Sequence, residues 1–462
     1  MSSSAASPSP CEVIVALTPF ARQNHVLVPD SSAERDRYRH TRAGRVLGVV
    51  ASVLRRFSQE GSLLLLLAAP AALAALDVRR SQSHVAWGAL VGLLAASFVV
   101  SFAYRLRGVR ASVSVPRRVA MGAATHLTVV LDNEGDASPT SLRVRGPFLP
   151  WDGQWQQRAT GLAVLRRGAR ARATLIATFH RRGEHHLDPV RVQALVPLGL
   201  ALGPPLFTEA PRFLVVPKVA NVTSLTLPRA RRHHPGGVPR VSHLADSREL
   251  AGVRPYRPGD PVRDLHTKTW ARTGVPHVRE YQEEFFTHVA VVVDAATTER
   301  KRKRYAEDAP LEAALSLAAG VVERLLRGET LIDLFVVGER VAGSQAHAPG
   351  AATTVEAPRA TPLGRGRGTL EVALDRLAAV EREAPLDVEV SVEPLLAERD
   401  RFAAIVLVCS EWDARREALV KKLETAGLAS LVLVTLPEGE RAAGTVRTVA
   451  AEAVLLGAAV PL

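Results

Sequence analysis

The stretch that decides the fold of the C-terminal part is His288–Asp294, which reads HVAVVVD. The run is apolar and β-branched without alternation, which is typical of a strand buried on both faces of a parallel sheet. It is followed by Pro310–Arg327, PLEAALSLAAGVVERLLR, where apolar residues recur at helical spacing behind an early proline. A strand followed by a helix is the unit from which α/β sheets are built.

The same alternation continues to the end of the chain. Strands are predicted at 331–338, 402–410 and 428–435, and helices at 369–383 and 413–427. Because right-handed crossovers place the carboxyl ends of parallel strands at one edge, a ligand is expected there. We therefore predict a doubly wound α/β domain over 286–462.

Oxygen-bearing side chains follow these strands. The candidates are Asp294, Thr298, Thr369 and Glu411. Carboxylates and hydroxyls from several strand ends suit Mg²⁺ or Mn²⁺, so these four residues form a degenerate candidate metal site. In the alternative interpretation, Asp294 caps a helix or satisfies loop amides.

Two apolar segments in the N-terminal part predict a transmembrane helical hairpin over 59–108. Gly61–Leu76 is apolar but short for a bilayer, whereas Val85–Tyr104 has no charge and is long enough to span. The two segments predict a multi-pass protein of the cell inner membrane. Arginines before the first segment and after the second outnumber those between them, which predicts the orientation. Both termini and the large domains would be cytoplasmic. The juxtamembrane arginines would contact anionic lipid, and residues 1–58 would be a largely disordered cytoplasmic segment.

Between the membrane and the α/β domain the pattern changes to short alternating runs with turn residues, which predicts an all-β sandwich over 109–218. The chain as a whole is then multidomain. The net charge of +13 alone does not distinguish lipid from nucleic acid, and two cysteines are too few for a disulfide framework.

A connector over 219–285 joins the two folded parts. Residues 248–284 read RELAGVRPYRPGDPVRDLHTKTWARTGVPHVREYQEE. Basic and acidic residues alternate at Arg248/Glu249, Arg263/Asp264 and Arg279/Glu280, which favours ion-paired protein docking over phosphate binding. A solvated, salt-bridged connector is the alternative. No nucleophile stands beside a base in an elbow motif, so no catalytic residue is assigned.

This segment resembles the signature of the domain of unknown function 58 family. The matching residues are Arg254, Tyr256, Arg257, Pro258, Gly259, Asp260, Arg263, His266, Lys268, Ala271, Arg272, Thr273, Gly274, Val278, Arg279, Glu280, Tyr281 and Glu283. The sequence departs from the signature at Asp264, Thr267 and Trp270, where the tryptophan is displaced by three positions, which indicates a repacked local surface.

The strand-end residues also resemble the metal-ion-dependent adhesion site of von Willebrand factor A-type domains. Asp294 matches the aspartate of that motif, Ala296 replaces its first serine, and Thr298 stands in for the second. Thr369 matches the distant threonine, and Glu411 lies where the last aspartate would be. One ligand is lost and another is altered.

The resemblance implies a membrane-anchored adaptor or scaffold with a von Willebrand A-like domain that works with a MoxR-type AAA+ ATPase. Other membrane proteins, such as transglutaminase-like proteins, are further implied partners. No catalytic activity is established for that family as a class, so we expect no enzyme, and the alternating charges predict no nucleic-acid partner. The expected partner-binding residues are Arg254, Tyr256, Asp260, Arg263, His266, Lys268, Arg272, Arg279, Glu280 and Tyr281. The alternatives are a metal-dependent enzyme that uses the Asp294 edge, or a binder of anionic lipid or nucleic acid.

Overall fold

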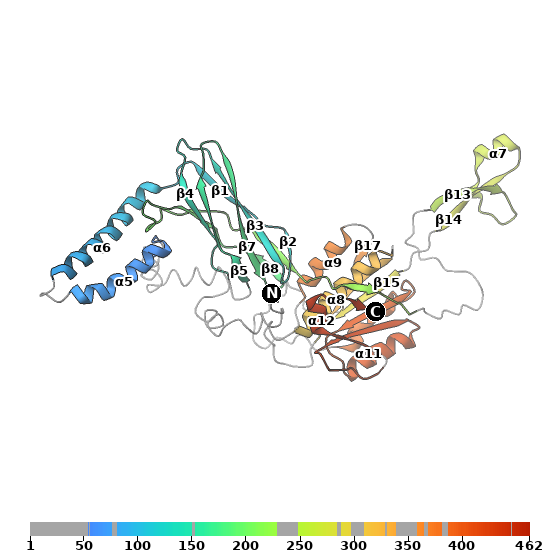
Figure 1. Cartoon of the computed structure of the whole chain (residues 1–462). Coiled ribbons are helices and arrows are strands. Elements are labelled where there is room, and N and C mark those ends of the chain that lie inside the picture. Colours follow the sequence, from blue (N-terminus) through green and yellow to red (C-terminus); the bar gives the residue numbers. More distant parts are fainter. Residues whose placement is uncertain are drawn as a thin grey trace, which may run out of the picture. The chain divides into compact units, whose positions relative to one another are not determined.

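The chain is multidomain and contains both sheets and helices (Figure 1). The computed structural model describes residues 54, 56–75, 81–149, 153–228, 248–283, 288–296, 309–328, 330–338, 358–364, 368–380, 387–444 and 446–462. The chain divides into two compact units, Met1–Lys218 and Val219–Leu462. The predicted N-terminal segment up to residue 53 and the candidate ligand Thr298 lie outside the described residues.

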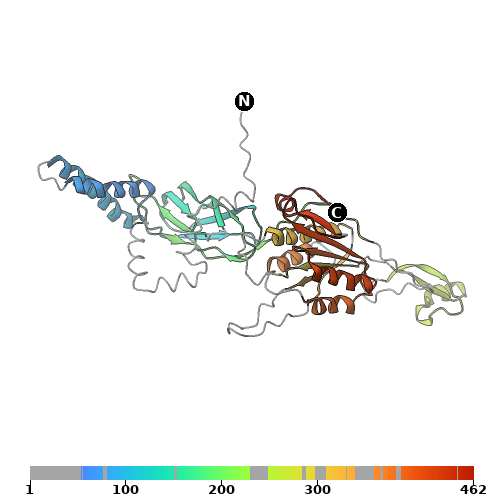
Figure 2. The same ribbon diagram turned by 90° about the horizontal axis from the view of Figure 1, so that it is seen from below.

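Two apolar helices of the first unit, α5 (Gln59–Ala75) and α6 (Ser81–Ser101), pack side by side (Figure 2). Phe57, before α5, stacks on Phe98 near the end of α6 at 5.9 Å between ring centroids, so the helices are antiparallel. Within the described residues, only Gln82–Tyr104 is long and apolar enough to cross a membrane by length and composition, and the apolar helix in α5 is shorter.

The strands between residues 109 and 216 form a β-sandwich. Two four-stranded antiparallel sheets share one buried cluster, which takes residues such as Leu127 and Leu175 from one sheet and Leu142 and Val192 from the other. The first sheet has the order β1 (Val109–Ser114), β3 (Ala124–Asn133), β7 (Arg170–Phe179) and β5 (Gly153–Gln157). The second has the order β10 (Leu206–Phe207), β9 (Arg191–Ala194), β4 (Thr140–Arg145) and β6 (Ala159–Val164). A third sheet joins β2 (Arg118–Ala120), β11 (Arg212–Val216) and β8 (Gly183–His186).

The second unit is organised around a six-stranded sheet. Its order is β17 (Thr361–Gly364), β16 (Leu331–Val337), β15 (His288–Asp294), β18 (Ala404–Cys409), β19 (Ser430–Leu436) and β20 (Arg447–Ala450). All neighbours pair in parallel except β17, which is antiparallel to β16. Numbered along the chain, the order is 3-2-1-4-5-6, which places a topological switch point between β15 and β18.

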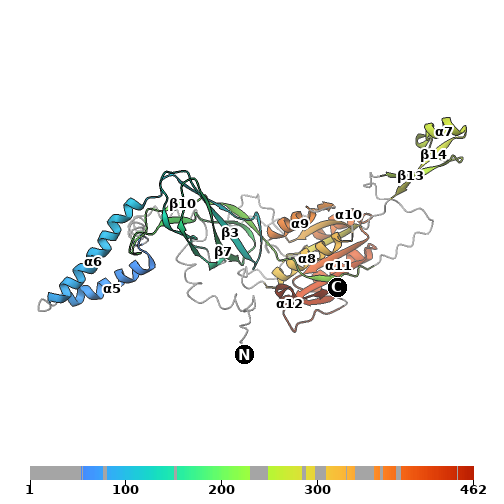
Figure 3. The same ribbon diagram turned by 45° about the horizontal axis from the view of Figure 1, so that its top comes forward.

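Helices cover both faces of this sheet, as the strand side chains require (Figure 3). Val289, Val291 and Val293 of β15 belong to one buried cluster and Ala290 and Val292 to the other. The first cluster includes residues of α8 (Ala309–Leu326), α9 (Thr369–Ala378) and α12 (Ala451–Leu456). The second includes residues of α10 (Val388–Ala397) and α11 (Ala414–Thr425). The helix predicted over 369–383 is shorter than expected and ends at Ala378.

A short strand near the start of the second unit pairs with the last strand of the chain that the structure describes. β12 (Val222–Ser224) pairs in parallel with β21 (Val460–Pro461). The preceding Ala220 lies against α8, where a side chain added at Gly320 would meet the Ala220 carbonyl oxygen at 2.4 Å. Glycine at this helical position therefore permits the close approach of the two backbones.

The signature segment lies in sequence between β12 and β15 and forms a separate two-stranded hairpin. Its strands are β13 (Arg248–Pro255) and β14 (His277–Glu283), which pair antiparallel with a register shift between Leu250 and Gly252. Their connection contains a 3-10 turn, η2 (Val262–Asp264), and the helix α7 (Thr267–Thr273). We call residues 248–283 the signature hairpin.

Candidate functional site

The switch point of the six-stranded sheet brings together the ends of β15 and β18. Asp294 and Cys409, the last residues of these strands, are register partners. The chain leaves β15 towards β16 on one side and later returns to β18 on the other, so the two following loops diverge from this point. In open α/β sheets ligands bind at this point. The sequence analysis expected a ligand at this edge of the sheet, with Asp294 among the candidate residues.

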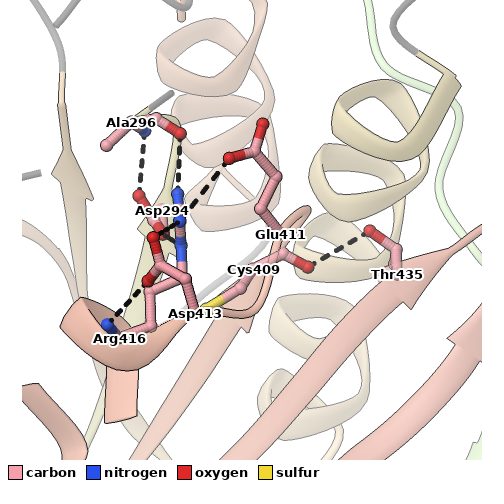
Figure 4. Close-up of polar contacts among 7 residues, drawn as sticks. All are labelled: Asp294, Ala296, Cys409, Glu411, Asp413, Arg416 and Thr435. Carbon is pink, nitrogen blue, oxygen red and sulfur yellow. Dashed lines mark hydrogen bonds and ion pairs between the residues drawn. The ribbon is translucent and has the colours of Figure 1, made fainter. Parts of the chain in front are cut away.

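The guanidinium of Arg416 fills the position between these loops (Figure 4). Its Nε donates to Asp294 Oδ2, and its Nη2 donates to the carbonyl oxygen of Ala296 at 2.8 Å. Its Nη1 lies 3.2 Å from Asp413 Oδ2 and 3.5 Å from Glu411 Oε2. One cationic side chain therefore links the β15 loop to the β18 loop.

This contact is buried. The side chains of Arg416 and Asp294 are only 2% and 3% exposed, whereas Glu411 and Asp413 are about a quarter exposed. Burial by itself would lower the pKa of Arg416, but the charge of Asp294 and the hydrogen bond to it outweigh burial and raise that pKa. The guanidinium is therefore a permanent positive charge inside the unit.

Local sequence fixes the position of Arg416. Asp413 caps α11, since its Oδ1 accepts from the backbone N–H of Arg416 at 3.0 Å. Its other oxygen faces the guanidinium of the same residue. Arginine in the first turn opposes the helix dipole, which favours acidic residues there. That anomaly is the sequence signal that could have pointed to Arg416, which the sequence analysis missed.

The candidate metal ligands are only partly brought together. Asp294 and Glu411 meet, but around a guanidinium rather than around a shared cation site. Thr369 is buried at the start of α9 and is not among the partners of Arg416. Asp294 Oδ1 accepts from the backbone N–H of Ala296 at 2.8 Å, as the alternative interpretation expected. Beside Asp294 and Glu411, the positive charge is supplied by the chain itself.

The signature hairpin is the second candidate site, and a bidentate ion pair organises it. The Nη1 and Nη2 atoms of Arg254 each donate to one oxygen of the Asp260 carboxylate at 2.8 Å. The backbone N–H of Arg257 donates to the same carboxylate at 2.8 Å. Gly259 has φ of +108°, a conformation that favours glycine. The RPYRPGD motif is thus a closed turn, and the ion pair differs from the three neighbouring pairs that the sequence suggested.

Polar caps fix the rest of the connection. His266 Nδ1 lies 2.7 Å from Thr269 Oγ1 and accepts from the Thr269 backbone N–H at 3.3 Å. At the other end of α7, Gly274 has φ of +71° and donates its N–H to Trp270 O. Arg254, Asp260 and His266 therefore shape the hairpin, although the sequence analysis assigned them to partner binding.

Very little of the signature hairpin is buried. Among the described side chains of 252–279, only Val278 is buried. Arg263, Lys268, Arg272 and Arg279 are exposed, as expected of contact residues, and Tyr256 is half-buried. The side chains of Glu280 and Tyr281 lie outside the described residues, although their backbone belongs to β14.

Three exposed apolar residues accompany these charges and were not assigned by the sequence analysis. Val262, Trp270 and Val275 are 72%, 43% and 52% exposed. Trp270 lies one helical turn beyond Thr267 in α7, so a displacement of the tryptophan by three positions keeps it on the same face. The departure from the family signature therefore moves an exposed aromatic ring along one surface.

The Arg254–Asp260 ion pair should make the conformation of the turn depend on pH. The hydrogen bonds from Arg254 and the Arg257 backbone lower the pKa of Asp260 from 3.8 to about 2. Since the folded pKa is depressed, this contact stabilises the turn above the unfolded pKa and is lost as the pH falls from about 4 to about 2. We expect the NMR shift of the Arg257 amide in the full chain to stay constant from pH 7 to 4. Asp260→Asn should change it already at pH 7, and Asp264→Asn should not.

The second unit is thus an α/β sheet whose switch point is closed by an internal cation, with an exposed hairpin inserted ahead of β15. Residues 252–433 match the model of the family described as "Protein of unknown function DUF58". The match spans the hairpin and most of the sheet and supports the resemblance drawn from the signature. It assigns no activity.

The remaining comparisons add little. No curated protein matches the chain. Solved structures that are similar include the CARDB domain of the PF1109 protein from Pyrococcus furiosus, at 12% identity and TM-score 0.16 over 23% of this chain and 91% of that one. The alpha-2-macroglobulin of E. coli is similar at 15% identity and TM-score 0.18 over 26% and 8%. A cohesin module from Clostridium perfringens is similar at 11% and 0.16 over 23% and 94%. At these scores none supports an argument about fold or function.

Proposed function

We propose that the chain is a membrane-anchored protein-binding scaffold and that the signature hairpin is its docking element. The observation that carries the proposal is the exposure of this hairpin, which keeps only Val278 buried among the described side chains of 252–279. An isolated two-stranded hairpin is at best marginally stable in water. Its polar caps nevertheless define one conformation, and its arginines and Trp270 are the residue types that dominate binding energy at protein interfaces.

The proposed partner is a MoxR-type AAA+ ATPase, as the family resemblance implies, with transglutaminase-like membrane proteins as further partners. The proposal assigns no catalytic step to this chain. The α/β unit is proposed to be of the von Willebrand A-like kind. The strand order 3-2-1-4-5-6, the antiparallel edge strand β17 and an aspartate at the switch point support that assignment.

Charge reversal on the hairpin tests the docking proposal. We expect Arg263→Glu and Arg272→Glu in the tagged full-length protein to abolish co-purification of the MoxR-type ATPase from mild detergent, because both side chains are exposed and basic. Thermal unfolding should not change. Arg415→Glu, an exposed arginine of α11, is the matched control and should retain the ATPase. Retention by all three variants would refute docking through the hairpin.

We propose that both apolar helices anchor the protein in the membrane. Both termini and the large domains would then lie in the cytoplasm, and the flanking arginines would contact anionic lipid. α6 supports it most directly, since Gln82–Tyr104 has a mean hydropathy of 2.1. Leu93→Arg places a charge on an exposed position of this helix and costs about 3 kcal/mol in the bilayer. We expect less of this variant than of the wild type in the membrane fraction that resists carbonate extraction. Val164→Arg, on an exposed position of the sandwich, should leave the fraction unchanged.

A further inference from the structure

We propose that Arg416 takes the place of a divalent cation at the switch point, so that this edge of the α/β unit works without metal. The inference goes beyond the scaffold proposal, because it concerns the second unit itself and holds whatever partner the hairpin binds. It rests on where one guanidinium lies and on which oxygen atoms surround it (Figure 4).

The first step is charge. Three carboxylates surround one guanidinium at the end of β15 and β18: Asp294 contacts its Nε, and Glu411 and Asp413 lie near its Nη1. Carboxylates converging at a partly buried place need a cation, since uncompensated charges are costly there. Arg416 supplies that cation from within the chain, and it cannot be deprotonated in a protein.

The second step is space. The Nε of Arg416 contacts Asp294 directly, and the Nη1 lies between Glu411 and Asp413. A divalent ion bound to Asp294 would have to displace the guanidinium or lie beside it, against like charge. Accordingly, no group of three or more His, Cys, Asp or Glu side chains suited to a metal is found in the part of the chain that the structure describes. In the wild type the guanidinium thus occupies the space that a divalent ion at Asp294 would need.

The third step is access. A metal at an adhesion edge must expose a coordination position to bind a partner's carboxylate, but the Arg416 side chain is only 2% exposed. A partner therefore cannot reach this cation. The positive charge is structural and holds the loop after β15 to the start of α11, through Ala296 and Asp294 on one side and the ion pair with Asp413 on the other.

The test uses Mn²⁺ as the probe on the purified full-length protein. Free Mn²⁺ is measured by electron paramagnetic resonance, and unfolding is followed with and without MnCl₂. For the wild type we expect no Asp294-dependent Mn²⁺ binding and no Mn²⁺-dependent shift in Tm. For Arg416→Ala, which leaves the three carboxylates without their cation, we expect Mn²⁺ to bind at least about tenfold more tightly than to the wild type and to raise Tm. Arg415→Ala should behave like the wild type.

Two further variants keep the test decisive. Arg416→Ala combined with Asp294→Asn should lose the gained Mn²⁺ binding. Arg416→Lys retains a cation at the same place and should not gain Mn²⁺ binding. It tests whether a cationic side chain excludes Mn²⁺, even if Arg416→Ala does not fold. Mn²⁺ binding by the wild type that Asp294→Asn abolishes would overturn the proposal. A folded Arg416→Ala that gains no Mn²⁺ binding would also overturn it. Neither result would bear on docking by the signature hairpin.

Discussion

Replacing Arg416 with alanine should lower the free energy of unfolding of the second unit by about 3–5 kcal/mol, the usual cost of removing one partner from a buried ion pair. The substitution removes the guanidinium that contacts Asp294, whose side chain is only 3% exposed. It also removes the donor to the Ala296 carbonyl, so the loop after β15 loses its tie to α11. Urea unfolding of the full-length protein, followed by circular dichroism, measures the change.

Arg415→Ala is the matched control, because it removes an exposed arginine from the adjacent position. Surface substitutions of this kind change stability by less than about 0.5 kcal/mol. Adding Asp294→Asn to Arg416→Ala should recover part of the loss, since the double variant no longer buries the negative charge that Arg416 contacted. A loss below about 1 kcal/mol for Arg416→Ala would mean that the guanidinium contributes little to the stability of the unit.

Trp270→Ala should weaken binding of the partner ATPase about 30-fold, which corresponds to about 2 kcal/mol for a tryptophan at the centre of an interface. The ring is 43% exposed on α7 and is flanked by exposed basic residues of the same helix, Lys268 and Arg272. Because the ring is not part of a buried core, the thermal unfolding of the protein should stay close to that of the wild type. Surface plasmon resonance with the immobilised full-length protein gives the dissociation constant.

Phe148→Ala is the control for this experiment. Phe148 is an aromatic residue of the first unit with 42% exposure, nearly the same as Trp270. It should bind the ATPase like the wild type. Equal affinities for Trp270→Ala and Phe148→Ala would show that the hairpin tip is not the contact, even if the ATPase binds elsewhere on the chain.

Much of the fold was predictable because the deciding elements are long and periodic. β15 has the predicted bounds, His288–Asp294, since each of its residues is buried on one face of the sheet or the other. α10 was not predicted. Its sequence VEVSVEPLLA alternates like a strand and contains Pro394, yet Asp387 caps it and Val392 and Leu395 pack into the core. Tertiary packing here overrides a weak local preference.

The candidate sites were predictable in position but not in chemistry. Asp294 and Glu411 follow strand ends, so topology alone places them at one edge. The contact that defines this edge joins residues 122 positions apart, Asp294 and Arg416, and no local pattern reports such a pairing. In the signature hairpin the charges were evident, but the sequence could not show that Arg254 pairs with Asp260 rather than with an adjacent residue.

The pairing of β12 with β21 affects the order of events during synthesis. The two strands come from opposite ends of the second unit, and Leu462 is itself buried in the core that they help to close. The sandwich strands all lie before residue 218, so the first unit can fold while translation continues. The second unit can finish folding only after residue 462 has left the ribosome exit tunnel. Until then β12 lacks its partner strand, and a nascent chain that stalls short of β21 lacks Val460 and Leu462 in its core and exposes apolar surface to chaperones.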